Sequence, residues 1–202
     1  MSTVVDTAPW TVQVVAGCGE DCGVPIYELD GKRPSISSEA FIHPESVIIG
    51  DVTIGPHCFI GPGAVIRADF GCVRIDEGSS IQDNVVIHVN GKSPGVVIEH
   101  DVIVGHGAIL HDAHVGPWCV VGMGAILLYD VYCEERSIVA AGSVLRRGMQ
   151  VPRGKLAAGN PARIIKDVSP EFMDYVKDGV AIYRRLSQQY PASMKRVDQS
   201  SK

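Results

Sequence analysis

The chain has 202 residues, a formal net charge of −5 and a hydrophobic fraction of 46%. This hydrophobic fraction excludes a disordered chain, and the lack of a basic cluster argues against nucleic acid as a partner. No segment approaches the roughly 20 apolar residues of a membrane-spanning helix, and the first basic residue is Lys32. A secretory signal begins with basic residues, so we expect a cytoplasmic protein without membrane attachment.

Residues 1–23 lack the pattern that organises the rest of the chain, and we interpret them as an N-terminal extension. Cys18 and Cys22 lie in this segment with three residues between them. This spacing allows a metal site or a disulfide, but a flexible glycine-rich turn is the favoured interpretation. Pro25 to Gly31 has the composition of an opening edge strand.

Aliphatic residues recur at every sixth position through the middle of the chain. The series continues across two insertions and one missing residue, and its one non-aliphatic member is still apolar. Its members are Ile36, Ile42, Ile48, Ile54, Ile60, Ile66, Ile75, Ile81, Ile87, Ile98, Val104, Leu110, Val115, Val121, Leu127, Cys133, Val139, Leu145 and Val151. Four positions after most of these residues stands a small residue, such as Ala64, Cys58 or Cys119.

A helix would place apolar residues three and four apart, and a single strand would alternate every two. A period of six predicts short flat strands joined at tight corners, with three hexads in each triangular coil. The aliphatic side chain points inward and stacks on its copy in the next coil. We therefore predict an all-β solenoid, a parallel β-helix of about six coils over residues 24–167. Its Cys58, Cys119 and Cys133 are expected to be inert small hydrophobes.

The grid indicates which of the seven histidines meet. The position that follows the aliphatic residue on one edge of the prism is occupied in successive coils by Ile49, Arg67, His88, His111 and Leu128. Neighbouring strands lie about 4.8 Å apart, so two stacked imidazoles can converge on one ion with Zn–N bonds of about 2.1 Å. The alternative is that these histidines are polar corner residues that share no ion.

His106 occupies a different place in its hexad. It precedes His111 by five residues, a stretch that spans roughly 16 Å when extended. A rotated copy of the chain could bring it to the same ion, which predicts a metal at a subunit interface. Three-fold symmetry would give three equivalent sites in each trimer.

A helix is predicted over residues 168–190. A turn at Gly159 to Arg163 precedes it, Ser169 is a suitable N-cap, and Pro170 suits the first turn. One face of this helix is apolar, and we expect it to pack on a wall of the solenoid, either its own or a neighbour's. That face contains Phe172, Val176, Val180, Tyr183, Leu186 and Tyr190. Residues 191–202 are predicted to form a flexible tail.

Several motifs together resemble the γ-class carbonic anhydrases, over about residues 25–167. The motifs are Arg67-Ala68-Asp69, Ile81-Gln82-Asp83-Asn84 with His88, and Gly105-His106 with His111. The turn and helix at the C-terminal end resemble the phenylacetate-degradation and carnitine-operon branch of that family. The resemblance implies a left-handed β-helix, an exception to the right-handed crossover rule.

The resemblance also implies a homotrimer with Zn²⁺, or Fe²⁺ or Co²⁺, between subunits. His88 and His111 of one subunit and His106 of its neighbour would be the metal ligands. Gln82 would orient the metal-bound hydroxide, and Arg67 would pair with Asp83 or Asp69 across the interface. Metal coordination lowers the pKa of bound water to about 7, and the hydroxide would attack CO₂ to give bicarbonate.

The sequence departs from the family prototype where acidic proton-shuttle residues are expected. Phe70 stands where a carboxylate would follow Asp69, and the loop over residues 89–95 contains no carboxylate. A shuttle would have to come from His114, Asp112 or buffer. We therefore expect slow CO₂ hydration.

Three other functions remain open at this point. The first is a CoA-thioester hydrolase or acyl-CoA-binding protein, which the carnitine and phenylacetate branch suggests. The second is an acyl-CoA transferase that uses His106 or His111 as a general base without a metal. The third is a non-catalytic scaffold in a larger assembly.

Overall fold

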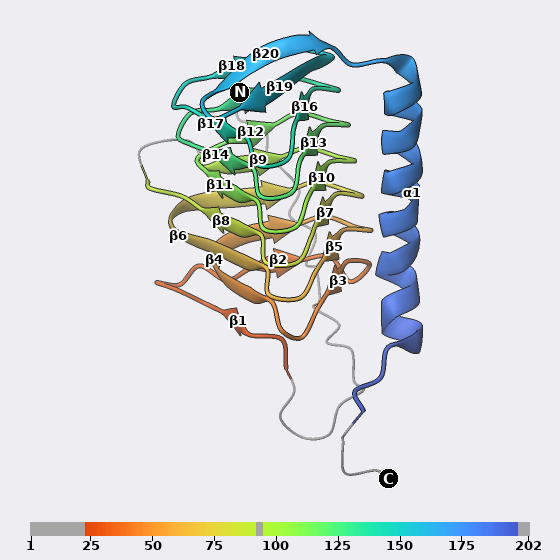
Figure 1. The fold of residues 1–202 in the computed structure, drawn as a ribbon. Coiled ribbons are helices and arrows are strands. Elements are labelled where there is room, and N and C mark those ends of the chain that lie inside the picture. The colour runs from red at the N-terminus through yellow and green to blue at the C-terminus, as the bar shows by residue number, and fades with distance from the viewer. Residues whose placement is uncertain (1–22, 92–94, 198–202) are drawn as a thin grey trace, which may run out of the picture.

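A computed structural model describes residues 23–91 and 95–197 of the chain. Within these ranges the chain winds as a left-handed parallel β-helix of about seven turns, followed by one α-helix. Figure 1 shows the coils stacked along one axis, with the helix standing beside them. The predicted all-β solenoid is thus confirmed, with about one coil more than the sequence count.

Three flat faces make up the prism, and the long strands β4 and β6 continue from the first face into the second. The first face consists of β1 (Ile26–Tyr27), β4 (Val47–Ile54), β6 (Val65–Ile75), β8 (Val86–His88), β11 (Ile109–His111), β14 (Ile126–Leu127) and β17 (Val144–Leu145). The second adds β2 (Ser35–Ile36), β9 (Val96–Ile98), β12 (His114–Val115), β15 (Tyr132–Cys133) and β18 (Gln150–Val151).

The third face is a separate sheet that ends in an antiparallel hairpin. It consists of β3 (Phe41–Ile42), β5 (Phe59–Ile60), β7 (Ser80–Ile81), β10 (Ile103–Val104), β13 (Val120–Val121), β16 (Ile138–Val139), β19 (Lys155–Gly159) and β20 (Ala162–Asp167). β20 pairs antiparallel with β19 and lies at the end of the stack. Figure 1 shows this hairpin covering the last coil, so the final sheet edge is not left as an open parallel strand.

The six-residue grid forms the core. Every member of the aliphatic series is buried except Ile42, which is partly buried and packs against the others. The register four positions later is also buried, apart from the partly buried Ala40 and Met149. Cys58 and Cys119 of this register and Cys133 of the aliphatic series are buried, as expected for small hydrophobes. Each coil places its inward side chain on the equivalent side chain of the next coil, so the core is one continuous column of thin layers.

Helix α1 spans Pro170–Ser193, against the predicted 168–190. The Ser169 side chain caps it by accepting a hydrogen bond from the backbone amide of Phe172 at 3.2 Å, as expected for an N-cap. Pro191 lies inside the last turn, so residues 191–193 are helical where the sequence predicted the start of a flexible tail.

The helix packs on the third face of its own chain. Val176 and Val180 are buried against Ile138, while Tyr190 contacts the rings of Phe41 and Phe59. Phe172 was predicted on this face, but it is 41% exposed.

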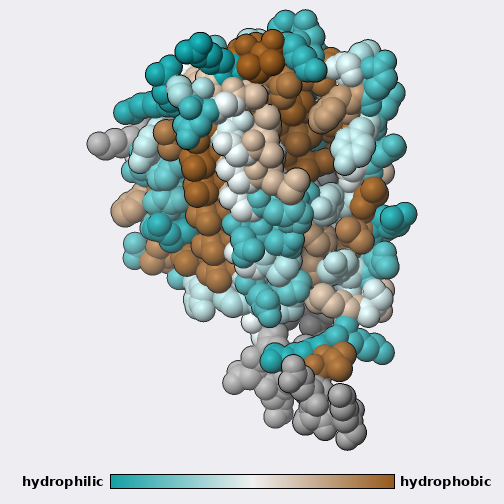
Figure 2. Space-filling view, in the orientation of Figure 1, coloured by the Kyte–Doolittle hydropathy of each residue, from teal (hydrophilic) through white to brown (hydrophobic). Residues whose placement is uncertain are grey.

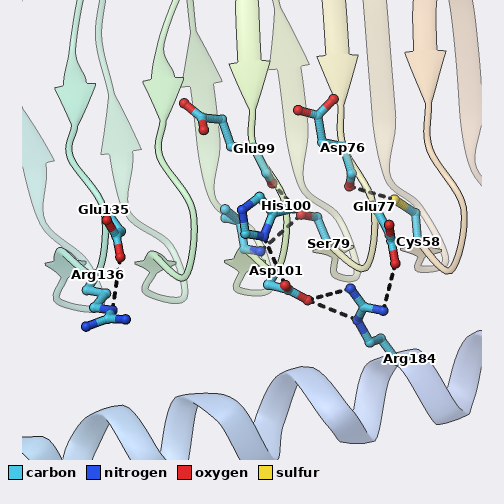
Figure 3. A network of polar contacts seen from close by, with 11 residues as sticks. Cys58, Asp76, Glu77, Ser79, Glu99, His100, Asp101, Glu135, Arg136 and Arg184 are labelled. Carbon is cyan, nitrogen blue, oxygen red and sulfur yellow. Dashed lines mark hydrogen bonds and ion pairs between the residues drawn. The ribbon is translucent and has the colours of Figure 1, made fainter.

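Arg184 joins the helix to two successive corners of the solenoid. Its guanidinium donates to Asp101 at 2.9 Å and to Glu77 at 3.0 Å, as Figure 3 shows. Asp101 also contacts Nδ1 of His100 at 3.0 Å. The carboxylate of Asp101 is almost fully buried, so this contact fixes the position of the helix against the coils.

Two expectations concern segments that the structure does not describe. The N-terminal extension, with Cys18 and Cys22, lies outside the described residues except for Gly23. The same holds for the last five residues of the chain. Among the helices of the described part, none is long and apolar enough to cross a membrane.

Candidate functional site

The predicted column of polar residues is present on the first face of the prism. Arg67 pairs in register with His88, and His88 pairs with His111 on the next coil. Ile87 and Leu110, which precede the two histidines, are fully buried. Because side chains alternate along a strand, both imidazoles point outward from the same face.

The two imidazoles meet. Nδ1 of His88 lies 3.0 Å from Nε2 of His111, and the ring centroids are 4.8 Å apart with the planes nearly perpendicular. The counting of insertions in the sequence therefore placed these two side chains correctly. The two ring nitrogens face each other directly across this short distance.

Each of these rings has a carboxylate on its other nitrogen. Nε2 of His88 lies 2.9 Å from Asp69, and Nδ1 of His111 lies 3.1 Å from Asp112. Arg67 also contacts Asp69, within the same chain. Burial raises the pKa of Asp69, but hydrogen bonds from its own backbone amide, His88 and Arg67 outweigh this and hold that pKa below its usual value.

Asp112 contacts the ring of His111, whereas the sequence suggested it only as a proton shuttle. It is buried, and it also accepts a hydrogen bond from the backbone amide of Asn90 at 3.1 Å. Its φ of 50° lies in the left-handed region, which Asp adopts more readily than most residues. Its position directly after His111 was the available sequence signal.

His106 lies away from the histidine pair, at a corner of the prism. It occupies the turn between β10 and β11, whereas His111 ends β11. Its Nδ1 lies 2.6 Å from Asp83, which occupies the same corner one coil earlier and accepts a hydrogen bond from the amide of Gly107. Gln82, beside Asp83, is buried.

A single chain does not assemble the three histidines. Among residues 23–91 and 95–197, no group of three or more His, Cys, Asp or Glu side chains is placed to hold a metal ion. Of the predicted residues, the chain brings Arg67, Asp69, His88 and His111 together at one place. It brings His106 and Asp83 together at another.

Aromatic residues flank the histidine pair, and the sequence did not single out their contacts. The ring of Tyr129 lies 4.4 Å from that of His111, and Arg147 lies 5.7 Å above the ring of Tyr129. At the other end, Phe70 makes an edge contact with His88 at 6.3 Å and is 65% exposed. The ring contacts thus continue from His111 to Tyr129 on the next coil.

His114, considered as a proton shuttle, lies on the second face of the prism. Its Nε2 contacts Glu99 at 2.6 Å, and its ring packs against Tyr132. Its strand, β12, pairs with β9 and β15 and not with the strands that carry His88 and His111.

An outward apolar column runs beside the histidine column, two residues earlier in each strand. Its members pair in register from coil to coil, and two of them, Val86 and Ile109, are more than a third exposed. The column consists of Val47, Val65, Val86, Ile109, Ile126 and Val144. Figure 2 shows that apolar side chains on the surface gather in columns along the stack.

The hexad grid and the three-faced coil define a hexapeptide-repeat β-helix protein, and comparisons with known proteins agree. Residues 33–68 match the family model described as bacterial transferase hexapeptide (six repeats). A hexapeptide transferase family protein from Anaplasma phagocytophilum has a similar solved structure, with a TM-score of 0.79 and 38% identity. The match covers 83% of this chain and 98% of that one.

Two curated relatives indicate the group within the hexapeptide-repeat family to which this chain is similar. Gamma carbonic anhydrase 1, mitochondrial, of Arabidopsis thaliana is 36% identical over 80% of this chain and 60% of its own length. Carnitine operon protein CaiE of Proteus sp. is 34% identical over 80% of this chain and 82% of its own length. The chain belongs to the hexapeptide-repeat family, in the group that includes the γ-carbonic anhydrases and CaiE.

The match to the plant relatives is partial. The chain spans 60% of the length of gamma carbonic anhydrase 1 and 58% of the length of gamma carbonic anhydrase 2, mitochondrial, also of Arabidopsis thaliana. The similarity supports an enzyme of the hexapeptide-repeat superfamily.

Proposed function

We propose that the protein is a metal-dependent enzyme of the γ-carbonic anhydrase type that hydrates CO₂ to bicarbonate. In this proposal the metal lies between subunits of a homotrimer, held by His88 and His111 of one chain and His106 of the next. The supporting observation is that each of these imidazoles has one ring nitrogen on a carboxylate, namely that of Asp69, Asp112 or Asp83.

Such carboxylates are the usual partners of metal-binding histidines, because they fix the ring and its tautomer and leave the second nitrogen for the ion. In His88 and His111 the remaining nitrogens already face each other. In His106 the remaining nitrogen is Nε2, on a side chain that is 47% exposed. The donor set therefore fits a borderline cation such as Zn²⁺, with Fe²⁺ or Co²⁺ as alternatives.

The proposed trimer explains why the third histidine is separate. His106 lies at the corner where β11 begins, and His111 lies at the other end of the same strand. A rotated copy can place its corner against the first face, next to the histidine pair. The outward apolar column beside that pair would then be covered by the neighbouring chain.

The other site residues have distinct roles in this proposal. A divalent cation held by His88, His111 and the neighbour's His106 would supply Lewis acidity and would bring the pKa of water to about 7. Gln82 presents a buried amide that can hold and orient the attacking water. Arg67 and Asp69 form an ion pair that fixes His88, and Asp83 fixes His106.

Release of a proton to solvent is expected to limit the rate of the proposed reaction. Phe70 occupies the exposed position beside His88, Asp112 is buried and hydrogen-bonded, and His114 lies on another face. Within the described residues no exposed carboxylate or imidazole contacts the histidine pair to carry a proton to solvent. We therefore expect slow CO₂ hydration whose rate increases with the concentration of an imidazole buffer, measured by stopped-flow pH indicators. A rate that is independent of buffer would contradict this assignment.

A second candidate is hydrolysis of a CoA thioester, in which the attacking water would react with the thioester carbonyl instead of with CO₂. The exposed ring of Phe70 and the ring of Tyr129 favour it, because CO₂ needs no aromatic contacts. Assays of CO₂ hydration and acyl-CoA hydrolysis, after loading with zinc and anaerobically with iron, separate the two activities.

Metal content tests the proposed function most directly. We expect about one metal ion per chain in the wild-type trimer and little metal in His106→Ala, measured by elemental analysis. His114→Ala is the matched control, because His114 is also paired with a carboxylate but lies on another face. An unchanged metal content in His106→Ala, or a monomer that keeps its metal, would refute the interface site.

A further inference from the structure

The side-chain column does not end at the histidines. Above His111 comes the ring of Tyr129, and above that ring comes the guanidinium of Arg147. Backbone contacts set this order, because the amide of Asp130 donates to Asp112 and the amide of Gly148 donates to Tyr129, both at 2.9 Å. Neither Tyr129 nor Arg147 has a task in binding a cation or in hydrating CO₂.

The end of the column is cationic. Arg147 forms one ion pair, from Nε to Asp130 at 3.2 Å, and its side chain is 71% exposed. Arg146 is exposed and makes no ion pair with any residue of the described chain. Among the described residues, the carboxylate of Asp130 is the only one that pairs with either guanidinium group, and it contacts Arg147 through Nε alone.

The two arginines border a hollow. An open depression is lined by Arg146, Arg147, Gly148 and Met149. Arginine presents a planar fork of donors that matches carboxylate and phosphate groups, and its stacking over an aromatic ring orients that fork. The hollow therefore offers charge and shape for an oxyanion, two coils beyond His111 of the proposed metal site.

We propose that Tyr129, Arg146 and Arg147 form a platform that binds the carboxylate or phosphate of an organic substrate, which we call the anion platform. The inference rests on the proposed metal site, because it places the reacting carbon of that substrate at His88 and His111. CO₂ is neutral and too small to reach the platform. The substrate class is an organic anion with an apolar part, which would contact the ring of Tyr129.

Binding measurements test the platform without relying on activity. Calorimetric titration of the full-length protein would use coenzyme A as a phosphate probe, benzoate as a carboxylate probe and pantetheine as a neutral probe. We expect at least one anion to bind the wild type, and Arg147→Gln to weaken it about tenfold, or about 1.4 kcal/mol. Arg147→Lys should retain part of the affinity, and pantetheine should not distinguish the variants.

Arg153→Gln is the control, because Arg153 is another exposed arginine paired with a carboxylate, that of Glu135. Binding of coenzyme A alone would identify a phosphate as the recognised group, and binding of benzoate alone would identify a carboxylate. Equal affinity of wild type and Arg147→Gln for both anions, or no binding of either anion, would overturn the platform.

The metal content of the same samples keeps this inference separate from the proposed function. A protein that holds its metal through His106 but binds neither anion has the proposed metal site without the anion platform. A protein that binds an anion through Arg147 but holds no metal has the platform without the proposed site.

Discussion

Three cysteine thiols in the core make the stability of the protein sensitive to alkaline pH. Burial raises the pKa of Cys58 to about 12 and that of Cys119 to about 11, and it raises the pKa of Cys133 still further. An unfolded chain ionises these thiols near their ordinary value of 9.0. The folded chain therefore holds more protons above pH 9, and its stability falls as the pH rises.

Replacing one thiol should remove the part of this loss of stability with pH that the thiol causes. Between pH 9 and pH 11 each buried thiol lowers the free energy of unfolding by about 1.4 kcal/mol per pH unit. Cys58→Ala should be less stable at pH 8 but lose stability more slowly as the pH rises, measured by urea unfolding at several pH values.

Val52→Ala is the control for this prediction. Val52 occupies the same register one hexad before Cys58, is equally buried and carries no ionisable group. It should lower the stability at every pH by a similar amount and leave the slope unchanged. Parallel curves for the wild type and Cys58→Ala would show that the thiol does not ionise on unfolding as described.

At the scale of elements, the attachment of α1 to the solenoid depends on one arginine. Burial lowers the pKa of Arg184, but hydrogen bonds and charge from Asp101 and Glu77 outweigh this and raise it above its ordinary value. The guanidinium therefore stays charged at any pH at which the protein folds. Figure 3 shows how this side chain reaches from the helix to two corners of neighbouring coils.

Removing that guanidinium should loosen the helix. Arg184→Met keeps most of the apolar stem but leaves the nearly buried carboxylate of Asp101 without its main partner. We expect a loss of about 2 kcal/mol in the free energy of unfolding and faster hydrogen exchange along α1. Arg185→Met is the control, because Arg185 is the exposed next residue. Equal effects of the two substitutions would contradict the assigned role of Arg184.

At the scale of the whole molecule, the fold follows from a local rule repeated many times. Each aliphatic residue of the hexad series specifies one inward position, so counting in sixes predicted the core and the pairing of His88 with His111. The contact between Arg184 and Asp101 was not predictable in this way, because 83 residues separate the two. It depends on where the helix returns along the prism, which no periodicity encodes.

The candidate site was predictable from the sequence only as far as strand register determines it. Strand register placed the histidines on neighbouring coils, but side-chain direction decides which groups touch them. The contacts of Asp112 and Tyr129 with His111 depend on the corner conformation after β11 and β14, which the hexad pattern leaves open.

Pro191 was expected to end the helix, yet in the last turn few backbone hydrogen bonds remain for it to remove.

At the scale of the assembly, the outward apolar column provides a test of the proposed trimer. Soluble monomers rarely leave a long contiguous apolar stripe exposed. Ile109 is 39% exposed and lies two residues before His111, on the same face of the same strand. A charge at this position would be buried without a partner if a neighbouring chain covers the column, and a buried unpaired charge is strongly unfavourable.

We therefore expect Ile109→Glu to be folded but monomeric by light scattering, and to hold little metal, because the neighbour's histidine is lost with the interface. Thr53→Glu should stay trimeric, since Thr53 is exposed on a strand segment of the second face that carries no histidine of the proposed site. A trimeric, metal-loaded Ile109→Glu would place the subunit contact elsewhere. The separation of His106 from the other two histidines would then need another explanation.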